Sequence, residues 1–349
     1  MQPEPAMDIQ RAIDLLSRFG HLQRDEAEAV MQQIMTGGAT DAQIAAYLMA
    51  LRMKGETHDE IAGSARAMRA NAHHVTTRFD AAELLDTCGT GGDRSGTFNI
   101  STTVAFVAAG AGIKVAKHGN RAASSKCGSA DVLQALGVNL DLTPEQVGQC
   151  VDEVGVGFLF APKLHPAMKY AIGVRRELGV RTIFNILGPL TNPAGARRQL
   201  MGVFAADLTD LLAHVLGELG SVSALVVSGY GGLDELTTTG PNKISHFRDG
   251  VVRSYELNPA DLGFRGAHIS ELQGGDPSSN AAILRGVLNG DIDDAKRDVV
   301  LLNSAAALLA GGKAETVADG IAQAAQIIDS GAAIDKLEAL IAVSQRFAA

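Results

Sequence analysis

The sequence predicts an α/β protein that joins a small N-terminal helical part to a larger part built on a mostly parallel sheet. Two observations carry this prediction. The first 75 or so residues show only helical spacing of apolar side chains, as in Ile9, Ile13 and Leu16. From Leu84 onward, short apolar strands alternate with helical segments, an order typical of parallel strands covered by helices. The 349 residues suffice for two domains and a sizeable core.

Helix boundaries in the N-terminal part follow from residue type. Thr40 with Gln43, and Thr57 with Glu60, have the spacing of capping boxes, in which two side chains satisfy the free N–H groups of a helix start. Gly55 stands where the helix before it should end, because glycine accepts the left-handed backbone of a helix terminus.

Short apolar runs of the larger part predict its strands. These candidate strands are 84–85 (the end of a strand), 113–116, 157–160, 199–204 and 224–227. Two further runs, 244–247 and 251–255, are joined by Asp249-Gly250 and predict a hairpin. The segment 165–178 is expected to be helical, and the last 70 residues return to helix.

The most informative stretch is 86–93, Asp-Thr-Cys-Gly-Thr-Gly-Gly-Asp, which has three glycines within four residues. It lies between a strand and an apolar helix that opens at 97–102, so backbone N–H groups and the helix dipole would face a bound anion. We therefore consider phosphate or pyrophosphate as the ligand. The spacing matches neither the P-loop nor the dinucleotide fingerprint, and a tight strand–helix connection is the alternative.

A second loop of this kind, 117–131, follows the strand 113–116 and leads into a helix that Ser129 could cap. Lys117 and Arg121 supply positive charge, although a solvated turn would also contain them, and a structural role is the alternative for His118. Loops at the ends of neighbouring parallel strands form one crevice, where open α/β sheets bind ligands.

Composition limits the class of protein. A net charge of −9 argues against nucleic-acid binding as the main function, although it is compatible with a local basic groove. Cys88, Cys127 and Cys150 lack metal-site spacing and predict no disulfide framework, with Cys88 interpreted as a small buried side chain. The N-terminus is unlike a signal peptide, and no apolar run approaches the ~20 residues of a membrane span. We expect a cytoplasmic protein with no membrane partner.

Several motifs in register resemble one family. Residues 89–93, 99–102, 117–121, 128–131 and 185–193 are similar to the signature of anthranilate phosphoribosyltransferases, and the likeness extends from about residue 10 to about 345. The resemblance implies transfer of a phosphoribosyl group from 5-phosphoribosyl 1-pyrophosphate (PRPP) to the amine of anthranilate, in tryptophan biosynthesis.

The resemblance also implies a domain plan. Residues 1–75, with about 165–188, would form a small helical domain that provides dimerisation and the anthranilate side. Residues 76–164 and 189–349 would form the α/β domain that binds PRPP. A homodimer through the N-terminal helices is expected, since these helices are too few for a large core of their own.

Site residues are implied in the same way. For PRPP they are Gly89, Gly91, Gly92, Asp93, Thr97, Asn99, Ser101, Thr102, Lys117, Ser124, Ser125 and Ser129. For anthranilate they are Gly89, His118, Asn120, Arg175 and Pro189, with Arg175 binding the carboxylate and Arg176 a surface charge. For Mg²⁺, expected at two ions per subunit, they are Ser101, Asp234 and Glu235.

Two of these assignments have a plain structural alternative. As an isolated dipeptide, Asp234-Glu235 would be an ordinary acidic turn, but its place after a strand and a glycine-rich turn favours the metal role. His165 is expected to be structural, because it begins a helix.

The implied chemistry needs no strong base. Loss of pyrophosphate from C1 of ribose passes through an oxocarbenium-like transition state, for which cations, fixed dipoles and alignment of the substrates matter most. No residue is assigned as catalytic with certainty, and Lys117, His118 and Arg175 are the closest candidates. The spacing of Ser101, His118 and Asp131 does not support a catalytic triad.

Two other classes of protein remain as rivals. A pyrimidine nucleoside phosphorylase would share the two-domain plan and the phosphate loop, but residues 120–121 and 185–193 favour the anthranilate enzyme. A non-catalytic nucleic-acid-binding relative is disfavoured by the acidic net charge and by the complete set of site residues.

Overall fold

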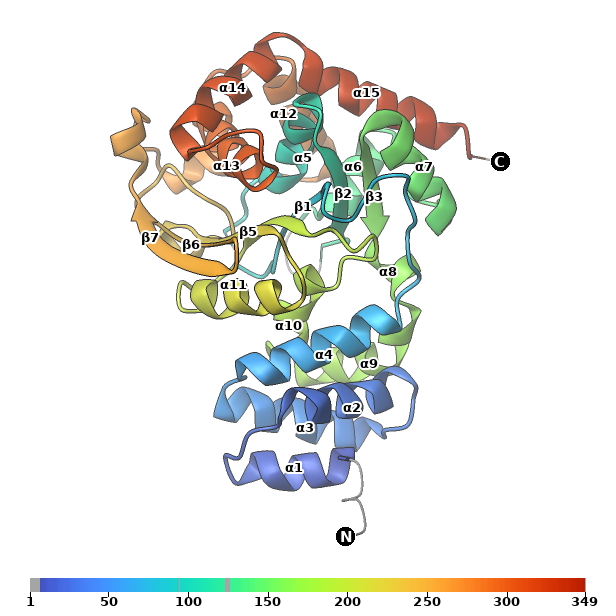
Figure 1. Cartoon of the computed structure of the whole chain (residues 1–349). Helices are drawn as coiled ribbons and strands as arrows, with labels where there is room; N and C mark the ends of the chain where they lie inside the picture. Colours follow the sequence, from blue (N-terminus) through green and yellow to red (C-terminus); the bar gives the residue numbers. More distant parts are fainter. Residues whose placement is uncertain (1–6, 94, 123–125, 349) are drawn as a thin grey trace. The chain divides into compact units, whose positions relative to one another are not determined.

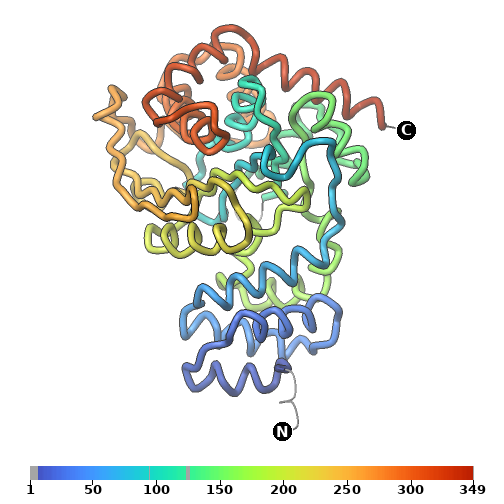
Figure 2. The backbone as a smooth tube through the Cα atoms, in the orientation of Figure 1, coloured from blue at the N-terminus to red at the C-terminus, as the bar shows by residue number. Residues whose placement is uncertain are grey.

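The computed structural model describes residues 7–93, 95–122 and 126–348. The chain forms two compact units, one of Met1–His73 with Pro162–Pro193 and one of His74–Ala161 with Ala194–Ala349. The chain therefore leaves the first unit after α4 and returns to it near residue 162, as its trace shows (Figure 2).

The first unit is helical. Its helices are α1 (Ile9–Ser17), α2 (Arg24–Met35), α3 (Asp41–Lys54), α4 (His58–Ala70), α8 (Ala161–Leu164, whose first residue belongs to the other unit), α9 (Lys169–Leu178) and α10 (Phe184–Leu187), with 3₁₀ turns η1 (Pro166–Met168) and η2 (Gly188–Leu190). The two predicted capping boxes are confirmed, because Thr40 and Thr57 each accept an N–H three residues on. The helix expected at 165–178 is interrupted, since η1 occupies its first turn and α9 begins only at Lys169.

The second unit is built on one seven-stranded sheet. Its strands are β1 (Leu84–Gly89), β2 (Lys114–Gly119), β3 (Val156–Phe160), β4 (Arg198–Gly202), β5 (Ser223–Ser228), β6 (Asn242–Arg248) and β7 (Val251–Leu257), in the order β3-β2-β1-β4-β5-β6-β7. The first five strands of this order are parallel. The predicted mostly parallel sheet is thus confirmed. The predicted hairpin is also confirmed, with Asp249 and Gly250 at φ values of 53° and 78° between β6 and β7.

Helices cover the sheet and form the C-terminal cluster. They are α5 (Ile100–Gly110), α6 (Ser129–Ala135), α7 (Pro144–Val154), α11 (Leu208–Glu218), α12 (Pro277–Leu288), α13 (Ala295–Ala310), α14 (Val317–Asp329) and α15 (Ala332–Gln345), with 3₁₀ turns η3 (Tyr230–Gly232), η4 (Pro259–Leu262) and η5 (Ile269–Leu272). Helices α5 and α13 pack on β1, β2, β4 and β5, and α11 lies on the opposite side of β5 and β6 (Figure 1). Right-handed crossovers that leave β1 and β4 in opposite directions require helices on opposite faces.

Three further local predictions were wrong. Strand β2 extends to Gly119, so Lys117 and His118 lie in this strand, where they pair with β3, and not in the loop that was expected to begin at residue 117. Leu84 begins β1 instead of ending it, so the motif residues Asp86, Thr87 and Cys88 lie inside the strand and are buried. Ser129 is the first residue of α6, whose N-cap is Gly128. The Ser129 hydroxyl donates instead to the Asn120 carbonyl, at 3.2 Å.

The topology brings the two sequence loops to the same edge of the sheet. The chain turns toward β2 after β1 and toward β5 after β4, so the topological switch point lies between β1 and β4. The carboxyl ends of all these parallel strands share one edge, where such folds bind ligands. No helix in the described part of the chain is long and apolar enough to cross a membrane.

Candidate functional site

Two glycines at the switch point make room for an acidic loop. Gly89, the last residue of β1, is the register partner of Gly202, the last residue of β4. A Cβ atom on Gly202 would collide with the Asp234 carbonyl oxygen, and one on Gly89 would collide with the Asp234 carboxylate. Gly89 was expected to contact both substrates. Its geometry shows a further role, because its missing side chain lets Asp234 approach the strand ends.

The acidic pair contacts the glycine loop and the start of α5. Asp234 Oδ2 accepts the Gly91 N–H at 2.6 Å, and Glu235 Oε1 accepts the Ser101 N–H at 3.1 Å. Burial, with repulsion from Asp93 and from Glu235, raises the pKa of Asp234. Burial also raises the pKa of Glu235, although Lys117 opposes this shift. The alternative of an ordinary acidic turn was therefore wrong, because both residues are half-buried and both carboxylates accept backbone N–H groups.

The acidic loop is anchored from behind by an asparagine that sequence reasoning missed. Asn303 of α13 is fully buried, and its amide accepts the Leu236 N–H at 2.9 Å and donates to the Leu236 carbonyl at 2.8 Å. The Asn303 side chain therefore binds both the N–H and the carbonyl of Leu236, the residue that follows Glu235. Nothing in the spacing around Asn303 distinguishes it from other polar residues of an amphipathic helix.

Lys117 is buried beside the acidic pair. Only 3% of it is exposed, and its Nζ donates to the Thr87 carbonyl and, at 3.4 Å, to the Ser101 hydroxyl. Burial lowers the pKa of Lys117, and the neighbouring carboxylates, first that of Asp86, oppose the shift. The solvated-turn alternative was therefore wrong for Lys117. His118, next along β2, is also buried, and its N–H donates to Asp86 at 2.9 Å.

The glycine loop has a backbone that favours glycine. Gly91, Gly92 and Gly96 have φ values of 68°, 77° and 71°, which residues with a side chain rarely adopt. Asp93 accepts the N–H and the hydroxyl of Ser95, at 3.1 and 2.7 Å. The loop thus brings the Asp93 carboxylate close enough to Asp234 to raise the pKa of Asp234.

The remaining PRPP candidates of this loop differ in accessibility. Thr97 is half-buried and its hydroxyl lies 3.2 Å from the Ser95 hydroxyl. Thr102 is buried, with its hydroxyl oxygen unbonded within the described residues. Asn99 is the N-cap of α5, yet its side chain does not cap the helix.

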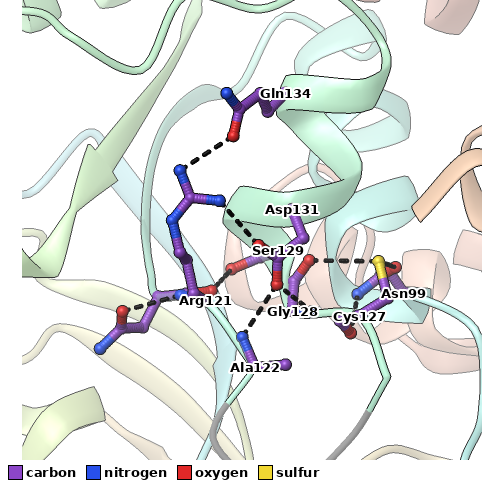
Figure 3. A network of polar contacts seen from close by, with 9 residues as sticks. Asn99, Arg121, Ala122, Cys127, Gly128, Ser129, Asp131 and Gln134 are labelled. Atoms are coloured by element: carbon purple, nitrogen blue, oxygen red, sulfur yellow. Dashed lines mark hydrogen bonds and ion pairs between the residues drawn. The ribbon is translucent and has the colours of Figure 1, made fainter. Parts of the chain in front are cut away.

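Asp131, a residue not among the predicted site residues, binds the described residues on both sides of positions 123–125 (Figure 3). Asp131 Oδ2 accepts the N–H groups of Ala122 and Gly128, both at 2.9 Å, and Oδ1 pairs with Arg121 at 2.8 Å. Partial burial works to raise the pKa of Asp131, but these donors outweigh it and hold the pKa below its usual value. The spacing Gly128-x-x-Asp131, that of an N-cap and its N3 residue, is a signal that could have found this role.

Other predicted residues lie outside the described residues or belong to the first unit. Ser124 and Ser125 lie outside the described residues. Arg175 and Pro189 belong to the first unit, whereas Gly89, His118 and Asn120 belong to the second. The Arg175 guanidinium lies 5.3 Å from the Phe184 ring centroid, and burial lowers its pKa. Arg176 is exposed, as expected of a surface charge.

The acidic pair fits a divalent cation. The pKa values of both carboxylates are raised, mainly by burial and also by repulsion from Asp93, and a bound cation would relieve that repulsion. The Ser101 hydroxyl lies close to Glu235 and adds a neutral oxygen. Oxygen donors of this kind are the ligands that Mg²⁺ prefers.

A parallel sheet with a glycine-rich loop, a buried lysine and an acidic pair at one edge suits a phosphorylated ligand with a divalent cation, and the class of protein is that of the glycosyl transferases. The chain matches the glycosyl transferase family in both of its parts, the helical bundle domain over residues 10–72 and the a/b domain over residues 81–334. Within that class, the chain belongs to the anthranilate phosphoribosyltransferase family. The resemblance found in the sequence is thereby confirmed.

Individual relatives support this assignment. The chain is 57% identical to the anthranilate phosphoribosyltransferase of Moorella thermoacetica over 94% of this chain and 96% of the relative, and 55% identical to that of Roseiflexus over 97% and 99%. The enzyme of Thermus thermophilus has a similar structure, with a TM-score of 0.91 and 43% identity over 96% of this chain and 99% of the other. The Saccharomyces cerevisiae enzyme in complex with PRPP and Mg has a TM-score of 0.88 and 27% identity, over 97% and 98%.

Proposed function

We propose that this chain transfers the phosphoribosyl group of PRPP to the amine of anthranilate, giving N-(5-phosphoribosyl)anthranilate and pyrophosphate. The convergence of Gly91, Ser101, Lys117, Asp234 and Glu235 at one edge of the sheet is the observation that carries the proposal. This reaction is the second step of tryptophan biosynthesis from chorismate.

PRPP binds on the two loops of the second unit. The glycine loop and the start of α5 face the pyrophosphate, because left-handed glycines let the backbone approach an anion closely and the dipole at a helix N-terminus attracts negative charge. Lys117 adds a positive charge that is held in place by Thr87 and Ser101. These fixed donors stabilise the charge that develops on pyrophosphate as it leaves C1.

The acidic pair and Ser101 hold Mg²⁺, at two ions per subunit. Bound Mg²⁺ neutralises charge on the pyrophosphate. Asp234 and Glu235 meanwhile keep the glycine loop and the first turn of α5 in register, since each carboxylate accepts a backbone N–H of those segments.

Anthranilate needs recognition more than activation. Its aromatic amine is already an uncharged nucleophile at neutral pH, so the chain must fix its position relative to C1. Arg175 is suited to the carboxylate, because a guanidinium presents two parallel N–H donors to a planar anion. Gly89, His118, Asn120 and Pro189 line the anthranilate side in this proposal.

The helical unit forms the interface of a homodimer. It exposes large apolar side chains at Phe19 (66%), Met53 (73%) and Ile172 (52%), after α1 and within α3 and α9. Apolar surface of this kind is typical of protein interfaces. Light scattering at micromolar concentration tests the proposal, and a monomeric mass with full activity contradicts it. The chain acts in the cytoplasm.

The loss of anthranilate fluorescence in the presence of PRPP and Mg²⁺, with release of pyrophosphate, tests the reaction directly. Thymidine with inorganic phosphate is the matched control, because a pyrimidine nucleoside phosphorylase would convert it. Phosphorolysis of thymidine without consumption of anthranilate would overturn the proposal. Binding of DNA without turnover of either substrate pair would support the nucleic-acid-binding rival.

A further inference from the structure

A buried amide side chain of the C-terminal helices is bonded to the PRPP loops. Asn280 lies in the first turns of α12, which packs on α5 and α6, and only 2% of it is exposed. Asn280 Oδ1 accepts the Gly275 N–H at 2.7 Å, and Asn280 Nδ2 donates to Asn99 Oδ1 at 2.9 Å. The side chain thus connects α12 to the residue that begins α5.

The segment before α12 is paired with the glycine loop. Phe98 N–H donates to the Leu272 carbonyl at 3.1 Å, and Gly274 N–H donates to the Gly96 carbonyl at 2.9 Å. A Cβ atom on Gly274 would lie 2.8 Å from Phe98 Cα and would also collide with the Asn280 amide. Asn280 is therefore held against the loop by close backbone packing, and its amide has little freedom to move away.

The two ends of this hydrogen-bond chain determine its direction. The Gly275 N–H can only donate, so Asn280 Oδ1 must face it and Asn280 Nδ2 must face Asn99. Asn99 Nδ2 in turn donates to the Cys127 carbonyl at 3.2 Å, which can only accept (Figure 3). The chain joins three segments, namely the loop before α12, the start of α5 and the loop before α6.

This arrangement keeps Asn99 from capping its own helix. An asparagine at an N-cap usually accepts an N–H of the first turn with its side-chain oxygen. The Asn99 side chain makes no such bond, and its oxygen is bonded to Asn280 instead. The N–H groups in the first turn of α5 must therefore bind other acceptors, and the Ser101 N–H donates to Glu235.

We infer that Asn280 is a positioning residue for the PRPP site, which acts by fixing the side-chain amide of Asn99. Its role is to hold Asn99 away from the helix N-terminus and to keep the two PRPP loops in register. The inference rests on the proposed function, since it concerns how that site is built for the phosphorylated substrate.

The test is the substitution Asn280→Asp. An aspartate still accepts the Gly275 N–H, but it presents a second acceptor to Asn99. The Asn99 amide must then turn over and place its oxygen against the Cys127 carbonyl. Because one hydrogen bond in the chain is lost and another is reversed, we expect the KM for PRPP and its Kd, measured by calorimetry with Mg²⁺, to rise about tenfold. The KM for anthranilate should stay within about twofold, as expected when a single site is affected. Asn280→Ala, which introduces no charge and removes both hydrogen bonds of the side chain, serves if the aspartate variant does not fold.

A double-mutant cycle with Asn99→Ala separates positioning from simple structural support. If Asn280 acts through Asn99, then Asn280→Asp changes the Kd for PRPP little in the Asn99→Ala background. Asn289→Asp, the same chemical change at the exposed end of α12, is the control and should leave the Kd for PRPP unchanged.

Three results would overturn the inference in an enzyme whose wild type turns over both substrates. These are an unchanged Kd for PRPP in the folded variants, an equal rise in both KM values with a lowered Tm, or full additivity in the cycle. Failure of the proposed function would look different, because the wild type itself would then not consume anthranilate.

Discussion

Asp131→Asn should weaken PRPP binding through the second loop. The carboxylate accepts three donors, from Ala122, Gly128 and Arg121, on its two oxygens. An asparagine has only one acceptor oxygen, so its NH₂ group must point either at the Arg121 guanidinium or at the two backbone N–H groups, and the bonds on that side are lost. The Arg121 side chain is 48% exposed, and that pair contributes at most about 1 kcal/mol. Replacing a charged acceptor by a neutral one weakens the two remaining bonds, and the total loss is about 2–3 kcal/mol.

This loss of binding energy is local, because it concerns only the hydrogen bonds of residue 131 to Ala122 and Gly128 and its pair with Arg121. If PRPP binds only when Ala122 and Gly128 are both bonded to residue 131, about 2–3 kcal/mol corresponds to a rise of about 30- to 150-fold in its Kd. Steady-state kinetics give both KM values, and thermal unfolding shows whether the fold is intact. The control is Asp293→Asn, since the Asp293 side chain is 90% exposed and lies 3.5 Å from Arg297. A KM for PRPP within twofold of the wild type, in a folded Asp131→Asn enzyme, would refute the reasoning.

Three further predictions address other residues. Arg175→Ala should raise the KM for anthranilate about ten- to a hundredfold with little change for PRPP, whereas Arg176→Ala, at an exposed position, should be silent; an unchanged KM for anthranilate would remove Arg175 from the site. Asp234→Asn with Glu235→Gln should abolish turnover without lowering the Tm, because two repelling carboxylates are neutralised; near-normal activity at low Mg²⁺ would contradict this. Burial, with repulsion from a neighbouring histidine, lowers the pKa of His165 to about 4, so the unfolded chain binds more protons between that value and about pH 6.5. The contribution of His165 to the free energy of unfolding is therefore fully present above about pH 6.5, and about 3 kcal/mol of it is lost as the pH falls toward 4. In urea unfolding at several pH values, His165→Gln should remove this pH dependence. The same pH dependence in the variant and the wild type would show that His165 is not its source.

The parts of the fold that depend on local signals were predictable from the sequence. The capping boxes at Thr40 and Thr57 and the Asp249-Gly250 turn involve residues a few positions apart, and all three form as expected. The boundary of β1 was misplaced, because polar Asp86 and Thr87 resemble a loop when their partners in the sheet are unknown.

The parts of the site that depend on long-range contacts were not predictable. The family resemblance implied Gly89 and Asp234 as site residues. Only the register of β1 with β4 shows that a pair of glycines makes room for the acidic loop. Asn280 and Asn303 act from helices more than 60 residues away from their partners, Asn99 and Leu236. A single sequence does not reveal the role of a buried asparagine on a helix, because that role depends on the hydrogen-bond partner that the fold brings to it.

The most direct test of the account is a crystal structure of the chain with PRPP and Mg²⁺. The account predicts the pyrophosphate between the glycine loop and the first turn of α5, beside Lys117, with Mg²⁺ bound by Asp234 or Glu235. PRPP bound away from this edge of the sheet, or Mg²⁺ bound without either carboxylate, would contradict it.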